Sequence, residues 1–181
     1  MKIRDSGMPD EAYWETLFDV PLIIDRLAVA RFHDVAELGC GYGTFTLPIA
    51  HAIVGTLYTC DVDPAMIART RERSTGLRVV CEHRDVMEHG FGVSVDAVLL
   101  FNILHGESPV TLFRHAAGAL RDGGEVLAIH WQHGPTPRGP DLEIRPRPEQ
   151  LVAWAAKANL SPVGKVIDLP PWHYGLRFER T

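Results

Sequence analysis

The sequence predicts an α/β protein with one doubly wound sheet of seven strands, mostly parallel and with an antiparallel last strand. Short β-prone runs alternate with helical patterns along the chain, and the run at residues 95–101 is almost wholly apolar. A glycine-rich turn at residues 39–43 follows the first of these runs. Alternating strands and helices indicate βαβ units, and a continuously apolar strand is typical of a parallel sheet covered on both faces.

Local signals place the elements in order. Asp10 is a candidate N-cap for helix within the first thirty residues, and Pro21 restarts a second helical stretch. Asp63 and Pro64 have the capping and first-turn chemistry of another helix, which runs to about residue 74. We expect the remaining helices to about residue 53 after the glycine turn, at 108–121 and at 149–158. We expect the strands at 35–38, 55–60, 77–81, 95–101 and 125–131, then near 163–169 and 173–180.

Composition and charge bound the class of protein. The chain has 181 residues, 46% apolar and 23% charged, with a net charge of −5, which is typical of one folded domain without a basic nucleic-acid-binding surface. Cys40, Cys60 and Cys81 form no C-x-x-C pair, so we expect free thiols and no bound metal. The start lacks the apolar core of a signal peptide, and no apolar stretch is long enough to span a membrane. We therefore expect a cytoplasmic protein.

Ligands of doubly wound sheets bind beyond the carboxyl ends of the strands, and the first of these ends carries Gly39, Gly41 and Gly43. A glycine turn between a strand and a helix lets backbone amides approach a ligand closely. The spacing is G-x-G-x-G, and Thr44 stands where a dinucleotide-binding fingerprint has its third glycine. The pattern disfavours a nicotinamide cofactor. A tight structural turn is the alternative interpretation.

Acidic residues follow the next two strands. Asp61 can accept hydrogen bonds from both hydroxyls of a ribose, and we favour it over Asp63, which the helix cap explains. Asp85 can accept a hydrogen bond from an adenine amino group, although a surface turn explains this residue equally well by position alone.

These residues together resemble a class I S-adenosylmethionine-dependent methyltransferase of the small stand-alone bacterial type, which has a Rossmann-like sheet. The match runs from about Val35 to Trp131, and Leu120–Leu127 resembles the family's glycine-glycine turn into the fifth strand. The resemblance implies S-adenosyl-L-methionine as the cofactor. It implies cofactor contacts at Glu37, Gly39, Cys40, Gly41, Gly43, Asp61, Val62, Asp85, Val86, Phe101 and Asn102, with Ile103 beside them.

The resemblance also implies how the chain is organised and which acceptors are disfavoured. We expect one domain, with residues 1–33 as a helical cap, 34–131 as the cofactor-binding core, and 132–181 as a loop, a helix and closing strands. The chain has no insertion for a substrate domain. Phe101–Leu104 stands where amino-group methyltransferases of nucleic acids and glutamine side chains have Asn-Pro-Pro-aromatic. A small-molecule acceptor is therefore favoured.

Candidates for contact with the acceptor follow the fourth and fifth strands. His130 and His133 are candidate general bases, because histidine exchanges protons near neutral pH. The chain has nine histidines, so some fall at strand ends by chance. The long loop at 133–148 carries Arg138, Arg145 and Arg147. These arginines bind an anionic acceptor, close as a lid, or pair with Glu143 in solvent. The candidate substrate contacts are Tyr13, Trp14, His105, Trp131, Arg145, Trp172 and Tyr174, each of which core packing or solvated pairing explains as well.

The sequence thus predicts methyl transfer to a small molecule, with no nucleic-acid or membrane partner. Two alternatives stay open, a nicotinamide-dependent oxidoreductase and a non-catalytic protein that binds a nucleoside cofactor. The oligomeric state, a homodimer included, is open as well.

Overall fold

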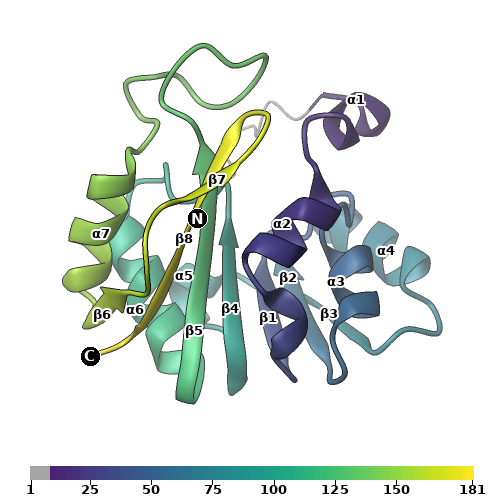
Figure 1. The fold of residues 1–181 in the computed structure, drawn as a ribbon. Coiled ribbons are helices and arrows are strands. Elements are labelled where there is room, and N and C mark those ends of the chain that lie inside the picture. The colour runs from purple at the N-terminus through teal and green to yellow at the C-terminus, as the bar shows by residue number, and fades with distance from the viewer. Residues whose placement is uncertain (1–8) are drawn as a thin grey trace.

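A computed structural model describes residues 9–181 (Figure 1). The strands are β1 (Val35–Leu38), β2 (Leu57–Asp61), β3 (Val79–His83), β4 (Val95–Phe101), β5 (Leu120–Trp131), β6 (Leu160–Pro162), β7 (Ile167–Leu169) and β8 (His173–Arg180). Within the described residues they form one eight-stranded sheet in the order β3-β2-β1-β4-β5-β8-β6, and β7 pairs with β8. Strands β1 to β5 are parallel, and β8 runs antiparallel to β5. The predicted fold class is confirmed.

Helices pack against both faces of this sheet (Figure 1). They are α1 (Glu11–Glu15), α2 (Val20–Arg26), the 3₁₀ turn η1 (Val29–Arg31), α3 (Thr46–Ala52), α4 (Pro64–Arg73), α5 (Val86–His89), α6 (Pro109–Ala119) and α7 (Pro148–Ala156). One apolar cluster joins α2 and α3 to one face, and a second joins α6 and α7 to the other. Strand β4 is buried along almost its whole length, as its apolar sequence predicts.

The capping predictions agree with the structure. The Asp10 side chain accepts from the Tyr13 N–H, and the Asp63 side chain accepts from the Ala65 N–H at 2.8 Å. The helical stretch predicted for the first thirty residues divides into α1 and α2, because Asp19 caps a new helix there. Of the predicted cap at residues 1–33, residues 1–8 lie outside the described part of the chain.

Two predictions about strands are wrong in detail. The single strand expected near residues 163–169 is two short strands, β6 and β7, separated by a segment in which Gly164 has φ +77°. Strand β5 begins at Leu120 rather than Glu125, since Leu120 already pairs with Val95 of β4 and the register shifts before Glu125 pairs with Ala97. A side chain at Gly124 would meet the Asp96 carbonyl at 2.9 Å, so the glycine is needed for this close approach.

The strand order reverses at β1, which has β2 on one side and β4 on the other. Ligand sites in open α/β sheets form at such a point, beyond the carboxyl ends of the strands. We call this edge of the sheet the rim. Among residues 9–181, none of the helices combines the length and the apolar character that a membrane crossing requires.

Candidate functional site

The glycine turn lies at the carboxyl end of β1 and leads into α3. Gly39, Gly41 and Gly43 have φ values of +81°, +49° and +81°, and residues other than glycine rarely adopt this backbone conformation. A Cβ at Gly39 would stand 3.7 Å from Ile103, so the turn from β1 lies directly beside the segment that follows β4. The glycines thus bring backbone close to the crevice between the two strands.

Asp61 closes the other side of this turn. One carboxylate oxygen accepts the Gly41 N–H at 3.1 Å and lies 3.9 Å from the Cys40 sulfur, and the other accepts the Asp63 N–H at 3.0 Å. The structure therefore separates the two acids as predicted, with Asp61 on the glycine turn and Asp63 on the helix cap. Burial raises the pKa of the Cys40 thiol, so the sulfur is no nucleophile at neutral pH.

Glu37 lies beneath the same turn and is almost completely buried. Its Oε2 accepts the hydroxyls of Thr46 at 2.6 Å and Thr59 at 2.7 Å. Burial raises the pKa of Glu37 to about 7, against the effect of the two hydroxyls, and the charge of Asp61 adds to the increase. The two threonines were not among the sequence candidates, because they are distant in sequence and become neighbours only when β1, β2 and α3 pack together.

The residues after β2 and β3 have local structural roles as well. Asp85 caps α5 by accepting the Met87 N–H at 2.8 Å, and Val86, the first residue of that helix, is buried. The Val62 backbone oxygen lies 3.1 Å from a ring nitrogen of His83. The cap was missed in the sequence because α5 is only four residues long.

Asn102, directly after β4, supplies unpaired polar atoms at the rim. Its φ is +58°, and both its amide oxygen and its amide nitrogen are buried without a hydrogen-bond partner among the described residues. The Thr44 hydroxyl at the end of the glycine turn is likewise buried without a hydrogen-bond partner among the described residues. Buried polar groups are normally paired, so these atoms fit a polar ligand held between β1 and β4. Phe101, by contrast, packs against Phe45 at 5.1 Å between ring centroids.

The three candidate histidines differ in their placement. His130 has no exposed surface, and its Nε2 lies 3.2 Å from Nδ1 of the partly exposed His105 in the loop after β4. His133 follows β5 and is also partly exposed. Burial, followed by the neighbouring His105, holds the pKa of His130 well below its usual range. The predicted direct contact of His130 with an acceptor does not fit this complete burial.

Arg145 organises the long loop after β5. Its guanidinium donates to the carbonyls of Gln132 at 3.0 Å, Gly134 at 2.9 Å and Pro140 at 2.7 Å, and to the Thr136 hydroxyl at 2.8 Å. Burial lowers the pKa of this guanidinium. The predicted contact with an acceptor and the predicted pairing in solvent do not fit, since Arg145 is buried and bonded to its own loop.

The predicted aromatic contacts divide between the rim and the core. Trp14 and Trp131 pack around Phe18, and Trp131 is almost completely buried. The Tyr174 hydroxyl donates to the Pro146 carbonyl at 2.9 Å and is buried on the opposite face. Trp131 and Tyr174 are therefore packing residues in this structure, a correction to their predicted contact with the acceptor. Tyr13 is exposed, and Trp172 is partly buried against the Trp131 cluster.

Tyr13 also connects the two segments above the rim. The guanidinium of Arg138, in the loop held by Arg145, lies 6.0 Å from the Tyr13 ring on α1. Figure 1 shows α1 and this loop at the same end of the sheet. Helix α1 is joined to α4 by ion pairs from Glu11 to Arg69 and Arg73. The rim is thus flanked by helix α1, which ion pairs hold to α4, and by the loop that Arg145 holds.

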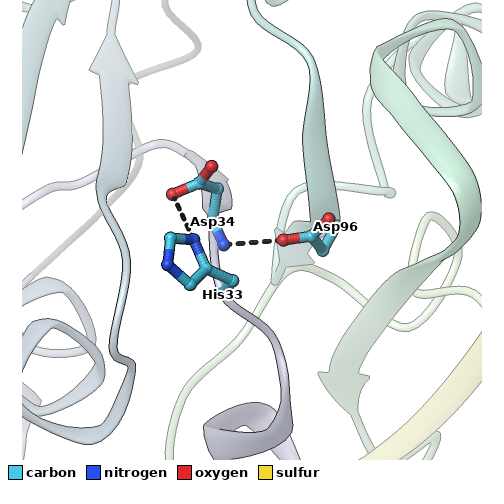
Figure 2. A group of neighbouring side chains, drawn as sticks. All are labelled: His33, Asp34 and Asp96. Carbon is cyan, nitrogen blue, oxygen red and sulfur yellow. Dashed lines mark hydrogen bonds and ion pairs between the residues drawn. The ribbon is translucent and has the colours of Figure 1, made fainter.

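A group of His33, Asp34 and Asp96 lies at the opposite edge of the sheet, before β1 and at the start of β4 (Figure 2). The Asp34 N–H donates to Asp96 at 2.8 Å, and the Asp34 carboxylate accepts the Thr56 N–H and lies 3.1 Å from the His33 ring nitrogen. Arg121 pairs with both carboxylates, at 2.8 and 3.2 Å. These bonds connect β1, β2, β4 and β5 at their ends. The group therefore has a structural role.

Comparisons with known proteins support one family. A family model described as a methyltransferase domain matches residues 35–124, about half of the chain. No curated protein sequence matches the chain. A SAM-dependent methyltransferase from Aquifex aeolicus is similar in structure, with a TM-score of 0.80, 18% identity and 93% of both chains covered. The N-methyltransferase NodS from Bradyrhizobium japonicum is similar as well, with a TM-score of 0.73 and 16% identity, and the match covers 94% of this chain and 89% of that one.

A larger structure shares the same core. The O-methyltransferase NcsB1 from neocarzinostatin biosynthesis, solved with S-adenosylmethionine, has a TM-score of 0.78 at 20% identity, and the match covers 94% of this chain and 57% of that one. The glycine turn, the acids at the ends of β2 and β3 and the strand order agree with this likeness. The chain belongs to the class I methyltransferases that use S-adenosylmethionine.

Proposed function

We propose that the protein transfers the methyl group of S-adenosylmethionine to a small-molecule acceptor at the carboxyl ends of β4 and β5. The observation that carries the proposal is the set of buried, unpartnered polar atoms of Asn102 and Thr44 beside the glycine turn. Leaving such atoms without a partner costs about 1–3 kcal/mol each. A polar ligand in the crevice would remove this cost.

The residues at the rim fit the cofactor by their hydrogen-bonding groups and by charge. Asp61 would accept the ribose hydroxyls, the glycine turn would hold the methionine part, and Asp85 would approach the adenine. Asp61 also adds negative charge beside the turn, which favours a cation. When bound, the cofactor supplies an electrophilic methyl group, whose bond to the positively charged sulfur breaks with the electron pair remaining on sulfur. The protein contributes by holding the reacting groups in line, which is worth up to about 7–11 kcal/mol in favourable cases.

A small acceptor is supported by the surroundings of the rim. The loop around Arg145 and helix α1 flank it, and the net charge of −5 disfavours nucleic acid. The structural neighbours include an O-methyltransferase solved with a dihydroxynaphthoic acid and a dimethyltransferase of a riboflavin derivative. At 18–20% identity these neighbours support the fold, so the acceptor has to be inferred from the site.

Methyl-labelled S-adenosylmethionine and a cell extract test the proposal. After incubation with the protein, the extract is separated by size into small molecules, protein and nucleic acid. We expect protein-dependent label in the small-molecule fraction. Label only in a macromolecular fraction contradicts the small acceptor, and binding of S-adenosylhomocysteine without any transfer would identify a non-catalytic binding protein. The Asp61→Asn variant is the control for transfer that depends on the crevice.

A further inference from the structure

Strand β3 is the outer strand on one side of the sheet, and one of its two faces is exposed. Within the described residues it pairs with β2 alone. The Cys81 sulfur lies 3.9 Å from the Ser74 hydroxyl at the end of α4, so that helix covers one face of the strand. Side chains alternate along a strand, and Val80 and Glu82 on the other face are both exposed. Val80 is 48% exposed although it is apolar.

Apolar side chains surround Val80 on this face. Tyr58 lies directly beside it, as its pairing neighbour on β2. The two residues line a pocket together with Phe91 and Val93, which precede β4. A free strand edge is a template for pairing with another strand, and apolar side chains next to the edge add area that such pairing removes from water.

The backbone of β3 directs alternate hydrogen-bonding groups out of the sheet. The Arg78 carbonyl and the Arg84 N–H both bond to β2, so the groups of the even-numbered residues point into the sheet. Those of Val79 and Cys81 therefore point away from it. The Arg71 side chain donates to the Cys81 carbonyl at 2.9 Å, and a carbonyl oxygen has a second lone pair for a further donor.

The charges on the exposed face select one register for pairing with an identical strand. Arg78, Val80 and Glu82 follow one another at every second residue, so they share this face. In an antiparallel pair with Val80 opposite its own counterpart, Arg78 of each copy stands opposite Glu82 of the other. The same register makes Val79 and Cys81 the hydrogen-bonded positions, which is what their outward groups require. Backbone and charge thus agree on one arrangement.

We propose that a second copy of this chain docks here, by antiparallel pairing of the two β3 strands about a two-fold axis at Val80. The Tyr58 and Val80 side chains of both copies form the centre, with an ion pair at each end. Arg78 is exposed and has no ion pair within residues 9–181. Glu82 binds Arg84 through one carboxylate oxygen at 2.9 Å, and its other oxygen can accept from Arg78 of the second copy. One pair of short strands is a small interface, and small interfaces are transient, so the dimer should dissociate at micromolar concentrations.

Sedimentation equilibrium of the full-length protein, from low to several hundred micromolar, tests the proposal. Arg78→Glu and Glu82→Arg each place like charges opposite one another at both ends of the interface, so each should raise the dissociation constant about tenfold or more. An equimolar mixture of the two variants should dimerise, because one chain then carries two acids and the other two bases. Arg114→Glu, an exposed change on α6, alters the net charge equally and is the control.

A second variant traps the register. Residues opposite each other at a non-hydrogen-bonded position have Cα atoms about 4.5 Å apart, which a disulfide spans. Val80→Cys should therefore form a disulfide-linked dimer under mild oxidation, whereas Val166→Cys, at a residue that is also 48% exposed, and the wild type should not. A wild-type monomer at every concentration overturns the proposal, whatever else covers the face. A dimer that both charge variants leave intact, or single variants that stay monomeric when mixed, overturns the assigned surface.

Discussion

At the residue scale, Glu37 combines full burial with two hydroxyl donors and a neighbouring acid. Its carboxyl group is easier to bury as the neutral acid than as the carboxylate, and its pKa is about 7 as a result. The ordinary value of 4.5 applies when the chain unfolds. The folded protein therefore holds the Glu37 proton more tightly than the unfolded chain does.

This difference predicts the pH dependence of folding. The stabilisation from protonated Glu37 is fully present below pH 4.5 and is lost as the pH rises to about 7, at about 1.4 kcal/mol per pH unit. Glu37→Gln is neutral at every pH and should be more stable than the wild type near pH 8, with a smaller difference or none near pH 5. Urea unfolding at both pH values measures this. Glu72→Gln, an exposed change on α4, is the control, and an equal response of both variants contradicts the burial argument.

Asp61 and Asp63 offer a second comparison of single residues. Asp61→Asn should weaken S-adenosylhomocysteine binding at least tenfold, because hydrogen bonds to a charged group contribute about 1.5–3 kcal/mol. Asp63→Asn should leave the affinity nearly unchanged, since asparagine caps a helix about as well as aspartate. Calorimetric titration gives both constants. Equal affinities would remove Asp61 from the cofactor site.

At the scale of elements, the loop between β5 and α7 has a defined structure because one buried guanidinium binds four of its own groups. Arginine can serve several carbonyls at fixed angles, which the compact ammonium of lysine cannot. The composition of the loop, rich in proline, glycine and arginine, is also that of a mobile segment. The defined structure of this loop therefore depends on the buried hydrogen bonds of Arg145.

Arg145→Lys should therefore open this loop. Carbonyls that lose their donor cost about 1–3 kcal/mol each, so trypsin should cut the bond after Arg138 several-fold faster than in the wild type. The matched control is Arg147→Lys, whose side chain is exposed. If both variants are cut at the wild-type rate, Arg145 does not hold the loop. Cutting after Arg145 itself is prevented in the wild type by Pro146.

At the scale of the whole molecule, the eight-stranded sheet brings the glycine turn, the acids at the ends of β2 and β3 and the polar end of β4 to one edge. Ligand that binds only there adds its binding free energy to folding. S-adenosylhomocysteine at about a hundred times its dissociation constant should add ~2.7 kcal/mol to the unfolding free energy. We expect S-adenosylhomocysteine to raise the melting temperature and NAD to leave it unchanged. A shift with NAD alone contradicts the family's cofactor for this chain.

How far the sequence predicts the site depends on the range of the contacts. The caps at Asp10 and Asp63 and the glycine turn involve neighbours within three residues, and these predictions agree with the structure. The start of β5 and the division of β6 from β7 were misplaced, because strand pairing rather than local propensity decides both. The short α5 was missed for a different reason, since four residues carry too little periodicity to be recognised.

The sequence by itself determined the alternation of strands and helices, the glycine turn and the acids that follow successive strands, because each is written in a local pattern. Only the tertiary structure decided that His130 lies wholly inside against His105, that Arg145 turns inward to its own loop, and that Trp131 and Tyr174 pack in the core on opposite faces. Side chains alternate between the two faces of a strand, but which face is covered, and by what, depends on helices distant in sequence. Burial is a property of the assembled sheet, and it separates the residues that support the rim from those that can meet an acceptor.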